Sequence, residues 1–206
     1  MISVLLADDQ TMIRSALAAL LTLETDIEVC GQAGTCAEAV AVARESQPDV
    51  VLLDVQMPAG GIDAEDGIAA LPALHLGAPG AKVIVVTTFG RPGYLRRALE
   101  AGAIGFMVKD APAERLIDGI RRAAAGLRVV DPELAVASLS MGPTPLSDKE
   151  SEVLAAATGG RSTSDIAKAL HLSEGTVRNY LSSAIGKLGA RNRAEAVRAA
   201  TDNGWL

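Results

Sequence analysis

Five side chains in the first part of the chain have the chemistry needed to hold a divalent cation and a phosphoryl group. Three are carboxylates, one is a hydroxyl and one is an amine: Asp8, Asp9, Asp54, Thr87 and Lys109. Crowded carboxylates repel one another and favour a cation between them, and their hard oxygen ligands suit Mg²⁺. Once the cation has neutralised the charge of the cluster, the Asp54 carboxylate could act as a nucleophile and form an acyl phosphate. The amine would pair with phosphoryl oxygens and the hydroxyl would donate a hydrogen bond to them.

The elements that would position these residues are short apolar runs alternating with alanine-rich helical segments. This pattern predicts βαβ units and a parallel sheet covered on both faces. The expected strands are about 2–7, 28–32, 50–54, 82–87 and 105–108, and the expected helices are about 11–23, 35–46, 62–76, 92–101 and 112–125. All five polar residues then lie at the carboxyl ends of strands, which form the ligand crevice of a doubly wound, flavodoxin-like sheet. Any one of them could instead only cap a helix or end a strand.

A second pattern, of short capped helices, fills residues 144–206. Ser147 and Glu150 form a capping box that opens a helix extending to about Thr158. A second helix is expected over Asp165–Leu170, and after a tight turn Ser173 is the expected N-cap of a third. A short helix, a tight turn and a capped following helix predict a helix-turn-helix.

The third of these helices has one apolar face and one polar face. The apolar residues recur at helical spacing and should face the core: Val177, Leu181, Ile185 and Leu188. The polar residues then point away: Arg178, Asn179, Ser182 and Lys187. Arginine suits guanine, asparagine suits adenine and serine suits either, so this face is chemically suited to base edges. The alternative is a plain three-helix bundle with a solvated polar face.

Length, charge distribution and helix-breaking glycines and prolines divide the 206 residues into two domains, 1–126 and 144–206. The linker between them, 127–143, could hold a short helix over Glu133–Met141. Residues 1–142 carry 11 basic and 18 acidic side chains, net −7, whereas residues 143–206 carry 8 and 7, net +1. The acidic first part does not favour nucleic acid. The stretch Ser173–Arg198, in contrast, favours nucleic acid because it has five basic residues against two glutamates.

Several other functional classes have little support in the sequence. No apolar run reaches transmembrane length, and Met1–Ser3 enters a core strand directly, which leaves no room for a signal peptide. We therefore expect a cytoplasmic protein without a membrane partner. The two cysteines, Cys30 and Cys36, are interpreted as packing residues, and the two histidines are isolated, so a disulfide, a zinc site or a histidine-based triad is not expected.

In its five site residues and its helix-turn-helix segments, the chain resembles the NarL/FixJ family of two-component response regulators. Members of this family join a receiver domain to a LuxR-type helix-turn-helix. The matching motifs span nearly the whole chain: the acidic pair, Asp-x-x-Met-Pro from Asp54 to Pro58, the threonine, the lysine, and the segments 146–154 and 172–180. The resemblance implies that Asp54 is the phosphoacceptor. It also implies that Asp9, Asp54 and the Gln56 backbone carbonyl bind Mg²⁺, with Asp8 acting partly through water. Thr87 and Phe106 match the family's switch residues.

For the second domain, the resemblance implies a set of DNA contacts. Arg178, Asn179 and Ser182 would face bases and Thr176 and Lys187 would face phosphates, with Ser173 at the start of the recognition helix. Gly186 stands where a basic residue is more usual. The last helix, about Arg193–Asn203, would pack and dimerise, and Trp205 would cap it.

The function implied is regulation of transcription. A partner histidine kinase would phosphorylate Asp54, and phosphorylation would promote a homodimer that binds double-stranded promoter DNA. The chain would not be an enzyme beyond its own phosphorylation and slow dephosphorylation. An aspartyl-phosphate phosphatase is the alternative, but it needs an acid two residues after the nucleophile, where this chain has Gln56. A degenerate receiver that ignores phosphate is disfavoured because all five site residues are present.

Three features depart from the family pattern. The stretch Ala59–Asp66 is about five residues longer than the usual loop; it could add a cation ligand, adjust kinase access, or be a tolerated insertion. Phe106 lacks the hydroxyl of the commoner tyrosine, so its switching would rest on packing alone. Thr88 and Phe89 are bulky neighbours of Thr87 and should hinder an attacking water.

Overall fold

The computed structural model describes residues 1–62, 64, 66–88, 90, 92–132, 134–136 and 144–206, which form two compact units. The first unit comprises Met1–Gly90 and Leu95–Ala135, and Val136–Leu206 make up most of the second. No helix among the described residues is long and apolar enough to span a membrane. The helix expected at Glu133–Met141 lies largely outside the described residues, although Leu134–Val136 are helical.

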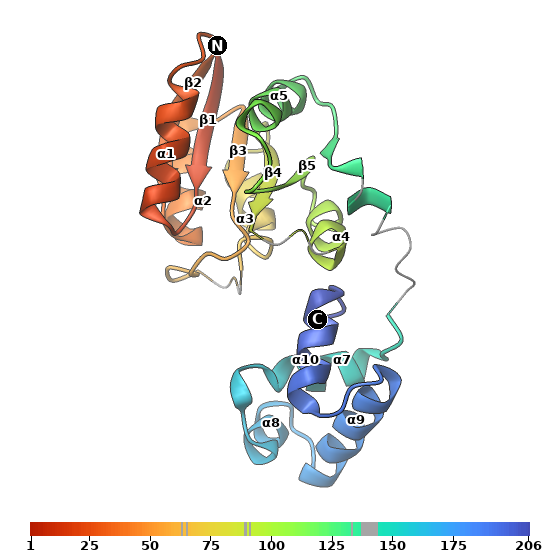
Figure 1. The fold of residues 1–206 in the computed structure, drawn as a ribbon. Helices are drawn as coiled ribbons and strands as arrows, with labels where there is room; N and C mark the ends of the chain where they lie inside the picture. Colours follow the sequence, from red (N-terminus) through yellow and green to blue (C-terminus); the bar gives the residue numbers. More distant parts are fainter. Residues whose placement is uncertain (63, 65, 89, 91, 133, 137–143) are drawn as a thin grey trace. The chain divides into compact units, whose positions relative to one another are not determined.

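The first unit is built on a parallel sheet with the strand order β2-β1-β3-β4-β5-β6 (Figure 1). Its strands are β1 (Ile2–Ala7), β2 (Ile27–Ala33), β3 (Val50–Leu53), β4 (Lys82–Thr87), β5 (Gly105–Val108) and β6 (Val129–Val130). The prediction of a doubly wound parallel sheet is confirmed, but the expected number of five strands was wrong. The sixth strand lies in the stretch expected to be linker. After Gly126, whose φ of 78° reverses the chain, Val129 donates its N–H to the Ile104 carbonyl and pairs with the edge of β5.

The helices of this unit are α1 (Thr11–Leu21), α2 (Cys36–Ser46), α3 (Leu71–Gly77), α4 (Pro92–Glu100) and α5 (Ala113–Ala124). Four agree with the expected ranges within a few residues, but α3 begins at Leu71 and not near residue 62. Two contacts hold the chain before it in a loop. The Asp66 carboxylate accepts the N–H of Ala69 at 2.8 Å, and Gly67 donates its N–H to the Val55 carbonyl at 2.9 Å.

Burial on both faces of the sheet explains why its strands are continuous apolar runs. All four residues of β3 are buried. Alternate strand residues, such as Val4, Leu52 and Ile84, join Leu21 of α1 and Ile120 of α5 in one core cluster. Residues of the opposite parity are also buried and must pack on the other face, so the sheet is held rigidly from both sides.

The second unit consists of short helices around a separate apolar core. They are α7 (Asp148–Ala156), the 3₁₀ turn η1 (Thr158–Gly160), α8 (Thr163–Ala169), α9 (Glu174–Lys187) and α10 (Arg193–Asp202). The predicted capping box at Ser147 and Glu150 is present, and Ser173 caps α9 by accepting the N–H of Thr176. His171, with a φ of 54°, makes the tight turn between α8 and α9. Val177 and Leu181 are buried, and Trp205 packs against this core.

Candidate functional site

The sheet brings four of the five predicted site residues to the ends of four adjacent strands. Asp8 follows β1, Asp54 follows β3, Thr87 ends β4 and Lys109 follows β5. These strands are neighbours in the order β1-β3-β4-β5, and they run parallel. Backbone bonds continue past the strand ends, because Asp54 donates its N–H to Ala7 and Lys109 donates its N–H to Thr87, at 2.9 Å and 2.8 Å. The site is therefore placed by the hydrogen-bonded centre of the sheet.

Three carboxylates form the acidic part of this site. One oxygen each from Asp8, Asp9 and Asp54 lies within 4.8 Å of the others. The Asp8 and Asp54 residues are only 4 % and 2 % exposed, whereas Asp9 is exposed to solvent. Burial of two such groups side by side requires a compensating positive charge, since burial removes the water that would otherwise stabilise them.

Lys109 supplies part of this compensation. Its ammonium lies 2.6 Å from Asp8 Oδ2 and 2.8 Å from Asp54 Oδ2. Burial raises the pKa of Asp54, and the hydrogen bond and charge of Lys109 oppose that shift without cancelling it. Burial by itself would lower the pKa of Lys109, but the hydrogen bonds to Asp54 and Asp8 outweigh it, so the pKa rises. A single ammonium balances only one of the three negative charges.

The second oxygen of Asp54 has a different environment. Asp54 Oδ1 is buried and has no hydrogen-bond partner among the described residues. A buried carboxylate oxygen without a donor is unfavourable by about 1–3 kcal/mol. Such an atom indicates a site built for something that is not part of the chain, either a cation or an electrophile.

The loop between β3 and α3 packs against the backbone of Asp54, the candidate phosphoacceptor. A Cβ on Gly67 would lie 1.9 Å from the Asp54 carbonyl oxygen, so only glycine fits there. Asp66 also forms an ion pair of 3.1 Å with Arg97 of α4. Of the acids in the long stretch 59–66, Asp63 and Glu65 lie outside the described residues. Its predicted roles therefore stay predictions.

The remaining predicted receiver residues lie around the same strand ends. Thr87 is buried at the end of β4, and Phe106 is fully buried in β5, paired in register with Val85. Gln56 follows Asp54 by two residues, just beyond the end of β3. Phe89 lies outside the described residues.

The helix α9 presents the polar face that the sequence predicts. Arg178, Asn179 and Ser182 are exposed, and Thr176 is partly exposed. Arg178 makes an exposed ion pair of 3.4 Å with Glu174, one turn earlier. An exposed pair of this kind contributes little and leaves the guanidinium accessible.

Lys187, which is predicted to contact DNA phosphates, has a partner inside its own domain. Its ammonium lies 2.6 Å from Oε2 of Glu150, a residue that is only 5 % exposed. Sequence reasoning identified Glu150 only as half of a capping box. Nothing in the local pattern could reveal the contact, because the two residues lie 37 positions apart.

Two family descriptions match the chain: the response regulator receiver domain over residues 4–121 and the luxR family of bacterial regulatory proteins over residues 144–200. The first alone covers more than half of the chain. The protein belongs to the LuxR-type response regulators.

Relatives of this response regulator share its whole length. It is 42 % identical over 206 residues to the transcriptional regulatory protein DesR of Bacillus subtilis (strain 168), with all of both chains covered. It is 38 % identical over 205 residues to the response regulator RamR of Streptomyces coelicolor (strain ATCC BAA-471 / A3(2) / M145), covering 100 % of this chain and 98 % of that one. It is also similar to a solved complex of the two-component response regulator RcsB with DNA, at 25 % identity and a TM-score of 0.68 over 98 % of each chain.

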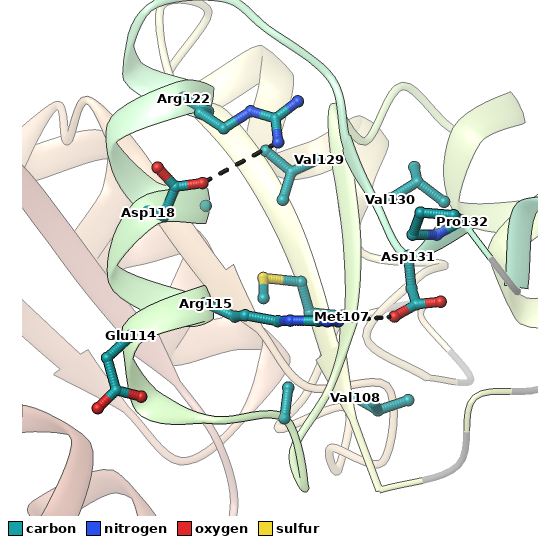
Figure 2. Close-up of a pocket in the computed structure, with 12 residues that line it drawn as sticks. Met107, Val108, Glu114, Arg115, Asp118, Arg122, Val129, Val130, Asp131 and Pro132 are labelled. Carbon is teal, nitrogen blue, oxygen red and sulfur yellow. Dashed lines mark hydrogen bonds and ion pairs between the residues drawn. The ribbon is translucent and has the colours of Figure 1, made fainter.

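The response regulator also has a hollow away from its acidic site. A cavity of about 500 Å³ lies between α5 and the β5–β6 edge, with Met107 and Val129 among its apolar lining (Figure 2). Charged residues on its rim pair with one another, as in the contact of 3.3 Å between Arg115 and Asp131. None of the predicted site residues lines this cavity.

Low pH should lower the stability of the LuxR-type domain of this response regulator, because it protonates Glu150. The hydrogen bond from Lys187, followed by those from the Ser147 backbone and Ser183, lowers the pKa of Glu150 from 4.5 to about 2. The ionised carboxylate therefore contributes to stability fully above pH 4.5, and that contribution is lost as the pH falls through about 2. We expect the difference in Tm between the wild-type chain and Glu150→Gln to shrink steadily over this interval in scanning calorimetry.

A matched control is available on the same helix. Glu152 forms an exposed ion pair of 2.5 Å with Lys149. Because such pairs contribute little, Glu152→Gln should change Tm only slightly. A Tm difference for Glu150→Gln that stayed constant with pH would contradict the assignment.

Proposed function

We propose that this response regulator is switched by transfer of a phosphoryl group from a partner histidine kinase to Asp54. The observation that carries the proposal is Asp54 Oδ1, buried and without a hydrogen-bond partner among the described residues, while Lys109 holds Oδ2. In the transfer, a P–O bond forms at Asp54, the P–N bond of the donor phosphohistidine breaks, and the histidine takes up a proton. Lys109 stays in place to pair with phosphoryl oxygens.

The acidic cluster supports a role for Mg²⁺ in this transfer. Three carboxylate oxygens within 4.8 Å of one another are the hard donor set that Mg²⁺ prefers. Asp9 and Asp54, with the Gln56 carbonyl, would hold the ion, and Asp8 would act partly through water. When bound, Mg²⁺ would neutralise the charge of the cluster and of the incoming phosphoryl group.

Asp9→Ala is expected to remove most of the Mg²⁺ affinity while keeping the fold. Asp9 is exposed, so its truncation removes a ligand without opening a cavity in the core. Calorimetric titration with MgCl₂ measures the affinity, and thermal melting checks the fold. Asp118→Ala, which removes an exposed acid from α5, is the control and should bind Mg²⁺ like the wild type. Equal affinity of the Asp9 variant would exclude Asp9 as a ligand.

We further propose that the chain is no phosphatase and that its aspartyl phosphate decays slowly. Gln56 stands where a phosphatase of this chemistry needs a general acid, and an amide cannot protonate a leaving group. Thr88 is a bulky residue directly after the switch threonine. We expect a lifetime of tens of minutes or longer by intact-mass spectrometry, and faster loss when Thr88 and Phe89 are both replaced by alanine. Decay within seconds without an added phosphatase would refute the steric argument.

Phosphorylation should act on DNA binding through dimerisation. A small helix-turn-helix offers few base contacts, so specific binding requires two copies on half-sites about one helical turn apart. The phosphoryl group on Asp54 should draw in Thr87 and shift Phe106, which alters the receiver surface. The partner in DNA recognition is double-stranded promoter DNA, read by Arg178, Asn179 and Ser182.

Two receiver faces are available for dimerisation, one formed by α1 and α5 and one formed by α4, β5 and α5, and the first has the stronger support. Met12, near the start of α1, and Leu23, just after its end, are 83 % and 78 % exposed. Ala16 and Ala19 lie between them and are also exposed, so the outer side of α1 is largely apolar, with Ser15 as an exposed polar residue within it. The Arg121 side chain of α5 is hydrogen-bonded to the segment after α1, including two contacts with Asp26 at 2.6 and 2.8 Å. These hydrogen bonds hold α1 and α5 together as one surface, which a second copy of the chain could contact.

A cytoplasmic location follows from these proposed partners, because promoter DNA is found there. Phosphate transfer to Asp54 and slow loss of that phosphate would be the only reactions the chain carries out. The function proposed is therefore phosphorylation-dependent control of transcription by a homodimer.

A further inference from the structure

A buried carboxylate joins the first helix of the LuxR-type domain to its recognition helix. Glu150 lies in the first turn of α7, and both of its oxygens contact residues of α9. Ser183 Oγ donates to Oε1 at 2.6 Å, and the Lys187 ammonium donates to Oε2 at 2.6 Å. The backbone N–H of Ser147 also donates to Oε2, at 2.6 Å.

These contacts exceed what a capping box requires. A capping glutamate needs one oxygen on the N-cap N–H, and the pair is normally local to a single helix. Here the same side chain is 5 % exposed and holds a second helix through a hydroxyl and a cation. A buried charge is tolerated only when it is fully hydrogen-bonded, so this arrangement has one low-energy geometry.

That geometry sets the rotation of α9 about its own axis. Ser183 and Lys187 are four residues apart and lie on one face of the helix, which Glu150 holds against α7. Arg178 and Ser182, also four residues apart, lie on the neighbouring exposed face, and Asn179 lies one turn before Ser183. A change in this rotation would move the base-reading face as a unit.

The same contact determines which cations of α9 are available to DNA phosphates. Arg178 and Lys187 are its basic residues. The Arg178 side chain is 64 % exposed and can exchange its weak pair with Glu174 for a nucleic acid partner, whereas the Lys187 side chain is 41 % exposed and its ammonium is already paired with a buried carboxylate. While it keeps this partner, the Lys187 ammonium would neutralise no phosphate and so release no counterions from DNA.

We propose that Glu150 is a specificity-determining positioning residue for DNA recognition: it orients α9 through Ser183 and Lys187 and withholds the Lys187 charge from DNA phosphates. The inference rests on the proposed reading of DNA by α9. It also replaces a direct phosphate contact by Lys187, which the family resemblance implies, with an indirect role.

The test compares the salt dependence of DNA binding between variants of the full chain. Glu150→Gln keeps the shape and the acceptor oxygen but removes the charge that neutralises Lys187. The freed ammonium should add one phosphate contact, so the slope of log K against log salt for a random-sequence duplex should steepen by about 0.9. The ratio of affinities between a duplex selected by the wild-type protein and the random duplex should fall. A structural role alone would lower both affinities and leave the slope unchanged.

Three further variants make the outcome decisive. Lys187→Met should leave the slope unchanged in the wild-type background, and the double variant Glu150→Gln with Lys187→Met should restore the wild-type slope. Glu152→Gln removes an exposed acid from the same helix and should not steepen the slope, which separates the local effect from net charge. Thermal melting confirms that each variant is folded.

The inference is overturned if Glu150→Gln leaves the slope unchanged, or if Lys187→Met flattens the wild-type slope by about 0.9, which would make Lys187 a direct phosphate contact. If the wild-type chain selects no sequence and binds no duplex, the proposed function itself fails. The wild-type titrations distinguish that case from failure of the Glu150 inference.

Discussion

Asp54→Asn is expected to abolish phosphorylation by acetyl phosphate completely, whereas the wild-type chain should gain the mass of one phosphoryl group in the presence of Mg²⁺. The asparagine has nearly the same size and can still accept a hydrogen bond from Lys109. It lacks the nucleophilic oxygen, however, that Asp54 Oδ1 provides without a hydrogen-bond partner among the described residues. Intact-mass spectrometry after a fixed incubation measures the result.

The control for this experiment is a second aspartate near the site. Asp110 directly follows Lys109, is exposed, and should be irrelevant to the transfer. Asp110→Asn should therefore be labelled to the same extent as the wild type. Full labelling of Asp54→Asn would show that another residue accepts the phosphate, and the assignment of the site would be wrong.

Phosphorylation is expected to convert the response regulator from a monomer to a dimer and to tighten binding to a selected duplex by roughly 10²-fold or more. Linking two recognition helices makes the second half-site contact effectively intramolecular, which is the source of the gain. Sedimentation velocity before and after acetyl phosphate treatment measures the association, and parallel DNA titrations at fixed salt measure the affinity.

Substitution on the apolar side of α1 tests whether this face forms the dimer. Ala16→Glu places a charge in the middle of the exposed surface of α1 and should abolish dimerisation while leaving phosphorylation of Asp54 intact. Leu76→Glu is the matched control, because Leu76 is an apolar residue of α3 that is 85 % exposed but lies outside the α1–α5 face. If phosphate tightened DNA binding while the protein stayed monomeric, release of an occluded recognition helix would be the better explanation.

The parts of this protein that the sequence determined are those governed by local rules. Parallel strands covered on both faces must be continuous apolar runs, and so β1, β3, β4 and β5 were predictable within a residue of their ends. Because the carboxyl ends of such strands share one edge, the convergence of Asp8, Asp54, Thr87 and Lys109 followed from their positions alone. Helix caps are equally local, and the capping box at Ser147 was predictable for that reason.

Contacts between residues far apart in the chain were decided only by the tertiary structure. The helix pattern expected from residue 62 onward yields to a loop, because Gly67 must approach the Asp54 carbonyl closely and Asp66 is drawn to Arg97. The short strand β6 exists only because the edge of β5 offers free backbone groups to it. The family resemblance implies that Lys187 contacts DNA, and the fold adds a partner by bringing the buried Glu150 within 2.6 Å of it. The two residues lie 37 positions apart, and no local pattern encodes the burial of so distant a carboxylate.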